Sequence, residues 1–227
     1  MRQKIFLSFA VLIFLIGTAW FCALQAKAQT TQNPLGDWSA YENEIWKVLI
    51  DEPEIHFQKA HELFMKKNYA GAASEIRKGS AFVKLEATRS NEEEKEALKG
   101  LAQDLDQLAD SVENGLVVTD ADLRFHFARA DQTLVRHHYT KATEYWTKNE
   151  VENAGHELKG ATGYLENAWK WSDQRMDLNT ADAVKGLHNV YGKMIKGSDW
   201  TKDEVAKGMQ DMGNEMTKLG KAMEKKK

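Results

Sequence analysis

Cysteine and proline are almost absent from this chain of 227 residues, which contains one cysteine, Cys22, and two prolines, Pro34 and Pro53. With a single cysteine the chain can form no internal disulfide, and every Cys-x-x-Cys redox, zinc or haem-attachment motif is excluded. Because proline interrupts helices, its scarcity favours long helices. The fold must therefore be stabilised by core packing alone, and about 200 residues can supply such a core.

Motifs for catalysis and phosphate binding are also missing. The sequence has no glycine-rich phosphate loop and no Gly-x-Ser-x-Gly nucleophile elbow. His61 and His156 are each followed by glutamate, as in a zincin helix, but Met65 and Gly160 replace the second histidine of that motif. No histidine follows a glutamate by three residues, which excludes the Glu-x-x-His signature of di-iron bundles. The chain is therefore predicted not to be an enzyme.

The N-terminus carries a long apolar run. Arg2 and Lys4 precede this run, Ile5–Leu24, and the small-residue site Ala26-Lys27-Ala28 follows it. This order is typical of a secretory signal peptide, so we predict that residues 1–28 are cleaved and that the protein is periplasmic or secreted. A run of about 20 residues can also span a bilayer. In that alternative the uncleaved segment would anchor an outward-facing chain and would be its one membrane contact.

The rest of the chain is acidic. Cleavage would remove three cationic residues, Arg2, Lys4 and Lys27, and no acidic residue, so the formal net charge would change from −3 to −6. Nucleic-acid-binding proteins usually carry a basic face, so no nucleic-acid partner is expected.

The chain contains an internal repeat. When the sequence is shifted by 82 positions, residues 56–87 align with residues 138–169 without a gap, and seven of the 32 pairs are identical. The identical pairs are His56/His138, Lys59/Lys141, Ala60/Ala142, Glu62/Glu144, Lys66/Lys148, Ala72/Ala154 and Glu75/Glu157. A repeat of this kind indicates a repeated structural unit.

Helix signals follow one another to the end of the chain. Asp37 can cap a helix that begins at Trp38, and Pro53 either kinks this helix or starts a new one. No segment alternates between apolar and polar residues, so no sheet is expected. Further helices are expected at 55–66, at 69–88, between Asn91 and Asn114, at 121–148, at 151–171, between a cap at Asn179 or Thr180 and Gly197, and after a capping box at Thr201.

These elements predict an all-α protein in which two duplicated antiparallel bundles, with about seven helices, are joined by the long helix 121–148. Residues 29–36 are expected to be a flexible leader. Residues 37–136 would form the first helical repeat unit and residues 137–227 the second. One continuous layer of helical hairpins is the alternative.

His56 and His138 occupy equivalent places in the two copies, on the apolar stripes of their helices. Each is a candidate metal or haem ligand inside its own bundle, and the glutamate pairs Glu62/Glu144 and Glu75/Glu157 repeat alongside. The alternative is a histidine at the bundle margin that is hydrogen-bonded to a neighbouring helix. A metal site needs three or four converging ligands, and one histidine per copy repeats, so the pattern favours the structural role. No cofactor is expected, and metal or haem is the alternative.

Two further patterns concern the core. Four methionines between Met209 and Met223 form a stripe on the last helix. Thioethers can bind Cu(I) or adapt to an apolar ligand, but methionine at three-four spacing is typical of a core.

Trp169 and Trp171 lie at the end of the second copy. Since residues two apart on a helix cannot both face one core, we expect one of these tryptophans at the surface. The alternative is that it packs under the loop that follows the helix.

The first copy has Ala60 and Leu63, a short Asn68-Tyr69 turn, then Ala72 and Ile76. This order resembles the turn region of a tetratricopeptide (TPR) helical hairpin. The repeat period of 82 differs from the period of about 34 in tetratricopeptide arrays, so the resemblance implies a TPR-like hairpin geometry only. The chain also looks like YfdX-type periplasmic helical proteins, which have a similar hairpin. Neither resemblance implies a functional residue.

The sequence thus predicts an exported helical protein that acts by binding an envelope protein or a small ligand, without catalytic activity. The alternative is a metal- or haem-binding helical bundle that uses His56 and His138.

Overall fold

The computed structural model describes residues 44–117 and 119–224. The chain divides into two compact units, Met1–Trp46 and Lys47–Lys227, and every helix named below belongs to the second. The predicted signal peptide, the leader at 29–36 and the helix start at Trp38 lie outside the described residues.

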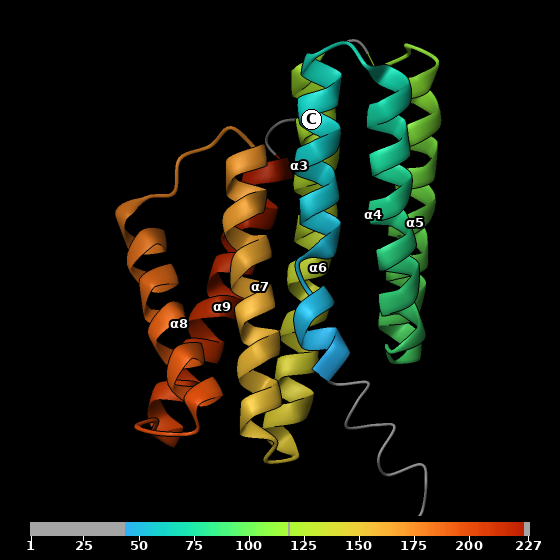
Figure 1. Ribbon diagram of the computed structural model, residues 1–227. Helices are drawn as coiled ribbons and strands as arrows, with labels where there is room; N and C mark the ends of the chain where they lie inside the picture. Colours follow the sequence, from blue (N-terminus) through green and yellow to red (C-terminus); the bar gives the residue numbers. More distant parts are fainter. Residues whose placement is uncertain (1–43, 118, 225–227) are drawn as a thin grey trace, which may run out of the picture. The chain divides into compact units, whose positions relative to one another are not determined.

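Seven helices make up the second unit, and no strand occurs among the described residues, which confirms the all-α prediction (Figure 1). None of the described helices is both long and apolar enough to cross a membrane. The helices are α3 (Glu52–Met65), α4 (Tyr69–Thr88), α5 (Glu92–Glu113), α6 (Asp120–Thr147), α7 (Val151–Trp171), α8 (Leu178–Lys196) and α9 (Lys202–Glu224).

Local capping explains most helix starts. Pro53 lies in the first turn of α3, so it starts this helix rather than kinking it. The side chain of Asn91 accepts a hydrogen bond of 3.0 Å from the Glu94 amide, as predicted. Helix α8 begins earlier than predicted, because the cap is Asp177, whose carboxylate accepts a 2.7 Å hydrogen bond from the Thr180 amide.

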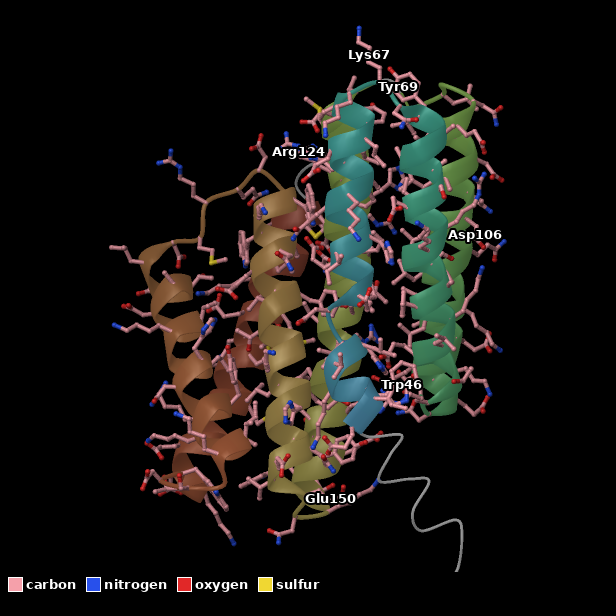
Figure 2. All side chains as sticks on the ribbon, in the orientation of Figure 1. Trp46, Lys67, Tyr69, Asp106, Arg124 and Glu150 are labelled. Atoms are coloured by element: carbon pink, nitrogen blue, oxygen red, sulfur yellow. The ribbon has the colours of Figure 1, made fainter. Side chains whose placement is uncertain are left out.

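The two predicted copies form hairpins, α3–α4 and α6–α7, that turn in the same way. Lys67 and Asn149 take the left-handed conformation, with φ of 59° and 62°. Each then donates its amide hydrogen to a carbonyl three residues earlier, at 2.8 and 3.0 Å. Figure 2 shows the first turn, with Lys67 and Tyr69, and the second turn, with Glu150, at opposite ends of the helices.

Helix α6 lies in the middle of the second unit. It contacts α3 and α5 on one side and α7 and α9 on the other (Figure 1). A single hydrophobic core contains residues from all seven helices. The predicted boundary between residues 136 and 137 falls inside α6, where the helix is continuous.

The core confirms one sequence interpretation and overturns another. Met209, Met212 and Met223 are buried, and Met216 packs against the core, so the methionine stripe is core. Trp169 and Trp171 are both buried, so the prediction that one lies at the surface is wrong. The reason is that α7 packs between α6 on one side and α8 and α9 on another, which covers two faces of the helix.

Helices α7 and α8 approach closely at Gly155. A Cβ atom there would lie 2.8 Å from the Cβ of Met194 and 3.1 Å from the backbone nitrogen of Ile195. Backbone cannot move aside as a flexible side chain can, so this position requires glycine.

Replacing Gly155 with alanine is therefore expected to destabilise the protein by about 1–3 kcal/mol, because the methyl group overpacks the α7–α8 contact. Gly163→Ala in the same helix is the control, since a Cβ there would meet nothing within 4 Å. That control should gain up to about 1 kcal/mol from helix propensity. Urea unfolding followed by circular dichroism measures both changes, and equal changes in the two variants would contradict the close contact.

Candidate functional site

His56 and His138 make the same contact in their own hairpins. The Nδ1 atom of His56 lies 2.6 Å from a carboxylate oxygen of Glu75, and that of His138 lies 2.7 Å from Glu157. Each imidazole also stacks on an aromatic ring at an equivalent position of the repeat. These rings are Phe82, at 5.6 Å between centroids, and Tyr164, at 5.3 Å. The repeat therefore encodes a histidine–glutamate–aromatic unit twice.

The two histidines do not come together. His56 lies on α3 and His138 on α6, and each is hydrogen-bonded to the glutamate of its own hairpin. Within residues 44–117 and 119–224, no group of three or more histidine, cysteine or acidic side chains is placed to hold a metal ion. The contacts are those of the structural interpretation, and metal or haem binding through His56 and His138 stays a prediction.

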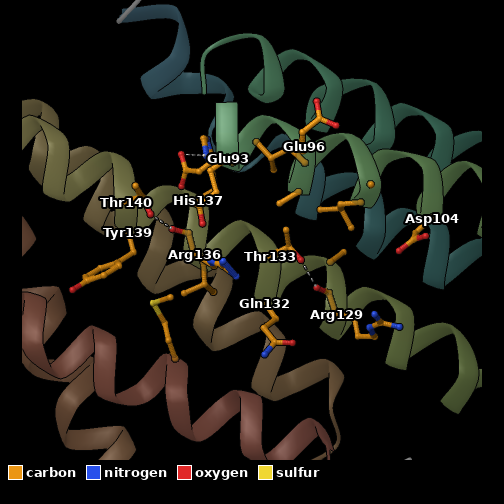
Figure 3. A pocket seen from close by; sticks show the side chains of 18 of the residues that line it. Glu93, Glu96, Asp104, Arg129, Gln132, Thr133, Arg136, His137, Tyr139 and Thr140 are labelled. Carbon is orange, nitrogen blue, oxygen red and sulfur yellow. Dashed lines mark hydrogen bonds and ion pairs between the residues drawn. The ribbon is translucent and has the colours of Figure 1, made fainter. Parts of the chain in front are cut away.

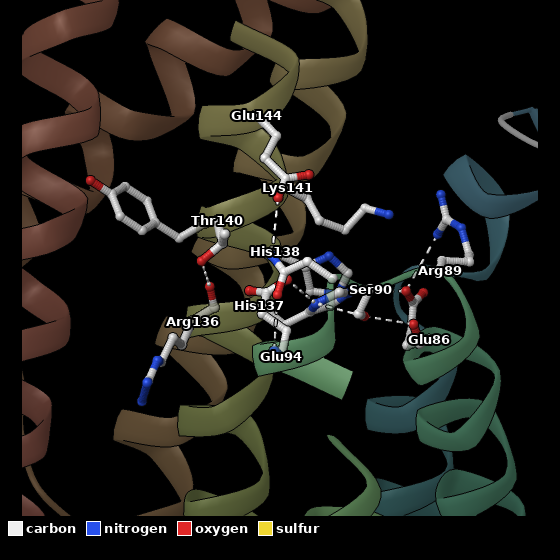
Figure 4. A network of polar contacts seen from close by, with 12 residues as sticks. Glu86, Arg89, Ser90, Glu94, Arg136, His137, His138, Thr140, Lys141 and Glu144 are labelled. Carbon is white, nitrogen blue, oxygen red and sulfur yellow. Dashed lines mark hydrogen bonds and ion pairs between the residues drawn. The ribbon is translucent and has the colours of Figure 1, made fainter. Parts of the chain in front are cut away.

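A more extensive site surrounds His137, which precedes His138 on α6 and faces α4 and α5. The Nε2 atom of His137 lies 3.1 Å from a carboxylate oxygen of Glu86, and Nδ1 lies 3.3 Å from Glu94 (Figure 4). Glu86 also forms an ion pair with Arg89 at 3.3 Å. His137 and Glu86 are 2% and 4% exposed, so these charges are held out of water.

The electrostatics of this site favour an ion pair. Burial alone would raise the pKa of the Glu86 carboxyl, but the hydrogen bond from His137 and the charges of His138, His137 and Arg89 lower it to about 2. Burial alone would lower the pKa of His137, but hydrogen bonds and charges from Glu86 and Glu94 raise it above its ordinary value of 6.5. Glu86 and Glu94 therefore favour the protonated, cationic form of the buried His137.

His138 extends the network to α7. The rings of His137 and His138 are 5.0 Å apart, and Lys141, one turn later, lies 4.0 Å from Glu157. Burial lowers the pKa of the Lys141 ammonium group. Burial would raise the pKa of Glu157, but the hydrogen bond and charge of His138 and the charge of Lys141 lower it. The network thus links α4, α5, α6 and α7 through adjacent residues of α6.

An open trough of about 820 Å³ runs along α6 beside this network (Figure 3). Side chains of α6 form its floor, α5 contributes one wall and α9 contributes the other. His137 and Glu94 line the trough, so the network borders it directly. Arg129 and Arg136 are exposed on the floor and form no ion pair in the part of the chain that the structure describes.

The α5 wall is acidic where the floor is basic. Glu93, Glu96 and Asp104 line this wall, and Glu96 is paired with Lys99 at 2.8 Å. His126 also lines the trough, where burial and then the charge of Arg129 lower its pKa, which favours a neutral ring. The trough therefore presents opposite charges on adjacent surfaces.

A buried carboxyl pair lies where α6 meets α3. Asp131 is fully buried, and neither of its carboxyl oxygens has a hydrogen-bond partner in the described structure. Burial raises the Asp131 pKa well above its ordinary value, and the charge of Glu54 raises it further. Burial also raises the pKa of Glu54, against hydrogen bonds donated by Gln58 at 2.9 Å and Trp171 at 3.2 Å. Burial and the neighbouring Glu54 therefore favour the protonated form of Asp131.

Ser90, His137 and Glu86 resemble a catalytic triad in composition, but their contacts differ from one. The Ser90 hydroxyl lies 3.5 Å from His137 Nδ1 and donates instead to the Glu86 carbonyl at 2.8 Å. A general base must be neutral to accept a proton, whereas Glu86 and Glu94 favour the cationic form of His137. In this arrangement the Ser90 hydroxyl is hydrogen-bonded to a backbone carbonyl rather than directed at the imidazole.

The repeat marks the His138 part of this site but not the His137 part. His138 and Glu157 are identical with their counterparts, whereas His137 aligns with Ile55 and Glu86 with Ala168. Comparison with known proteins adds no relative, since no family model, curated protein or solved structure matches the chain.

We expect the stability contributed by His137 to depend on pH. Since its folded pKa lies above 6.5, this contribution is complete below about pH 6.5 and is lost as the pH rises through the folded pKa. The variant His137→Gln should lose about 3 kcal/mol at pH 6, because the half-buried Glu94 loses its cation and the buried Glu86 keeps only Arg89. In this variant the free energy of unfolding should also not decrease above pH 6.5, whereas in the parent protein it does.

Urea unfolding between pH 5 and 9 measures this dependence. His188→Gln is the control, because His188 is half-exposed and pairs with Glu166 at the surface at 3.2 Å, so its effect should stay within about 0.5 kcal/mol. If the free energy of unfolding of His137→Gln still decreases above pH 6.5 as it does in the parent, His137 is neutral.

Asp131 should produce a separate pH effect. Because its folded pKa is raised, the folded state holds the proton more tightly, and the free energy of unfolding decreases as the pH rises from 3.8 towards the folded pKa. Each unit of that rise corresponds to about 1.4 kcal/mol. The isosteric variant Asp131→Asn cannot ionise, so it should be more stable than the parent at pH 8. Asp182→Asn, at an exposed position of α8, is the control. A loss of stability at pH 8 in Asp131→Asn would contradict the protonated state.

Proposed function

We propose that this chain is an exported helical protein that binds a partner or ligand in the trough along α6, without catalytic activity. The observation that carries the proposal is the pair of unpaired cations on the trough floor, Arg129 and Arg136. A trough of about 820 Å³ is within the range of about 300–1,000 Å³ typical of ligand sites. Charged groups that gather without partners in a hollow favour recognition of a complementary charge.

Export is supported by the order of charged, apolar and small residues in 1–28, and the lack of catalysis by the charge state of His137. The resemblance to TPR-like and YfdX-type hairpins is consistent with a helical binding protein. These parts of the proposal rest on sequence patterns together with the contacts of Ser90 and His137.

We also propose that the fold arose by duplication of a four-helix unit in which α6 is shared. Each helix contact within α3–α6 has a counterpart within α6–α9. The pairs α3–α4, α4–α5, α5–α6 and α3–α6 correspond to α6–α7, α7–α8, α8–α9 and α6–α9. The repeated left-handed residues Lys67 and Asn149 and the repeated His–Glu pairs support the same relationship. The two predicted bundles would then overlap at α6, and the trough floor would belong to both.

The proposal is tested by immobilising the protein and measuring what it retains from an extract of its native compartment. Immobilised protein should retain a specific protein or small molecule, identified by mass spectrometry, and the double variant Arg129→Ala/Arg136→Ala should lose it. Lys185→Ala/Lys196→Ala removes two exposed cations from α8 and is the matched control. Equal retention by all three proteins would place binding outside the trough. The same preparation tests export, because the N-terminal residue of the native protein should be Gln29.

A further inference from the structure

We infer that the occupant of the trough is an amphipathic α-helix of a partner protein, with acidic residues facing α6 and basic residues along the edge next to α5. This inference rests on the proposed function and names the class of partner. It follows from the spacing of the floor residues, the small residues on both walls and the distribution of charge.

The floor of the trough has the spacing of a helix-packing face. The α6 residues along its middle are exposed or half-buried and recur at intervals of three and four: His126, Arg129, Thr133, Arg136 and Thr140. This interval is the one at which a helix presents residues to a neighbouring helix. The stripe covers 14 residue steps, or about 21 Å of helix, so the trough accepts a helix of about four turns.

The walls leave room for a backbone to approach. Glu93 and Asp104 lie apart along the α5 wall (Figure 3). The small residues Ala97 and Gly100, which also line the trough, lie between them in the sequence. A Cβ atom added at Gly100 would meet nothing within 4 Å. On the α9 wall, Gly213 is equally small, and a Cβ there would meet the Tyr139 hydroxyl at 3.6 Å, an ordinary contact. Small residues opposite a helix face permit the close approach that helix packing needs.

The distribution of charge distinguishes a helix from other occupants. Arg129 and Arg136 are two turns apart, about 10.5 Å along the axis, and a helix with acids at the same interval can pair with both. A polyanion would be repelled by Glu93 and Asp104 on the adjacent wall. A lipid chain needs exposed apolar surface, whereas the leucines that line the trough are already covered. Leu98 is 1% exposed, Leu101 8% and Leu105 2%.

A helix with two charged edges satisfies both surfaces at once. Its acidic residues would lie over Arg129 and Arg136, and its basic residues would lie beside Glu93 and Asp104. Its third edge would face Met216 on α9, which is half-buried and adapts to apolar side chains. The helix-in-groove mode uses such an arrangement, with charges setting orientation and apolar residues seating the helix.

The test uses two fluorescent, stapled helical peptides of about 17 residues. The first carries glutamates seven residues apart on one face and lysines on the adjacent edge, and in the second these charges are exchanged. Fluorescence anisotropy should show the first peptide binding the intact protein at least about tenfold more tightly than the second. The variant Arg129→Glu/Arg136→Glu should reverse that preference, whereas Lys185→Glu/Lys196→Glu, with the same change in net charge, should keep it.

The other outcomes overturn the inference. Equal affinities, or no binding of either peptide, would exclude the acidic helix. A further outcome is that neither peptide binds while the immobilised protein still retains a native partner in a way that depends on Arg129 and Arg136. In that case the trough binds something other than an acidic helix, and the proposed function stands. Competition by vesicles containing phosphatidylglycerol would assign the cations to a lipid surface. A dimer that dissociates in Arg129→Glu/Arg136→Glu would make the occupant a second copy of this chain.

Discussion

The buried His137 connects the first helices of the unit to α6. It lies between Glu86 at the end of α4 and Glu94 at the start of α5, so a single side chain fixes the α4–α5 turn against the middle of α6. A buried ion is tolerated only when its charge and hydrogen bonds are matched. Here His137 and Arg89 face the two carboxylates of Glu86 and Glu94. The trough lies along α6 next to this contact, between α5 and α9.

Each side of α6 meets a different neighbour through a different polar residue. Asp131 faces α3 as a buried carboxyl, His137 faces α4 and α5, and His138 faces α7 through Glu157. The side that remains carries Arg129 and Arg136 into the trough. A helix surrounded on so many sides cannot show one apolar stripe and one polar stripe, as a surface helix does. Polar residues are therefore distributed around α6, and their roles depend on which helix each one meets.

Local features could be read from the sequence, and distant contacts could not. The hairpin arms 69–88 and 151–171 have the predicted bounds, because caps and left-handed turn residues act over a few positions. The repeat marks His138 together with Glu144 and Glu157, and the structure shows Glu157 as its hydrogen-bond partner. The contacts of His137 join residues 43 and 51 positions apart and have no counterpart in the first copy, so no local or repeated pattern marks them. The burial of both tryptophans likewise depends on α8 and α9 covering α7.

The proposed sharing of α6 would account for a trough at this place. If α6 is both the last helix of one four-helix unit and the first of the next, it has a neighbour from each unit, α5 from the first and α9 from the second. Both then border the face of α6 that carries Arg129 and Arg136, and each packs against α6 by its own edge. A helix bound in that position would contact an element from each unit, together with the end of the His137 network. A helix bound in the trough and the buried ion pairs of His137 would therefore contact the same stretch of α6.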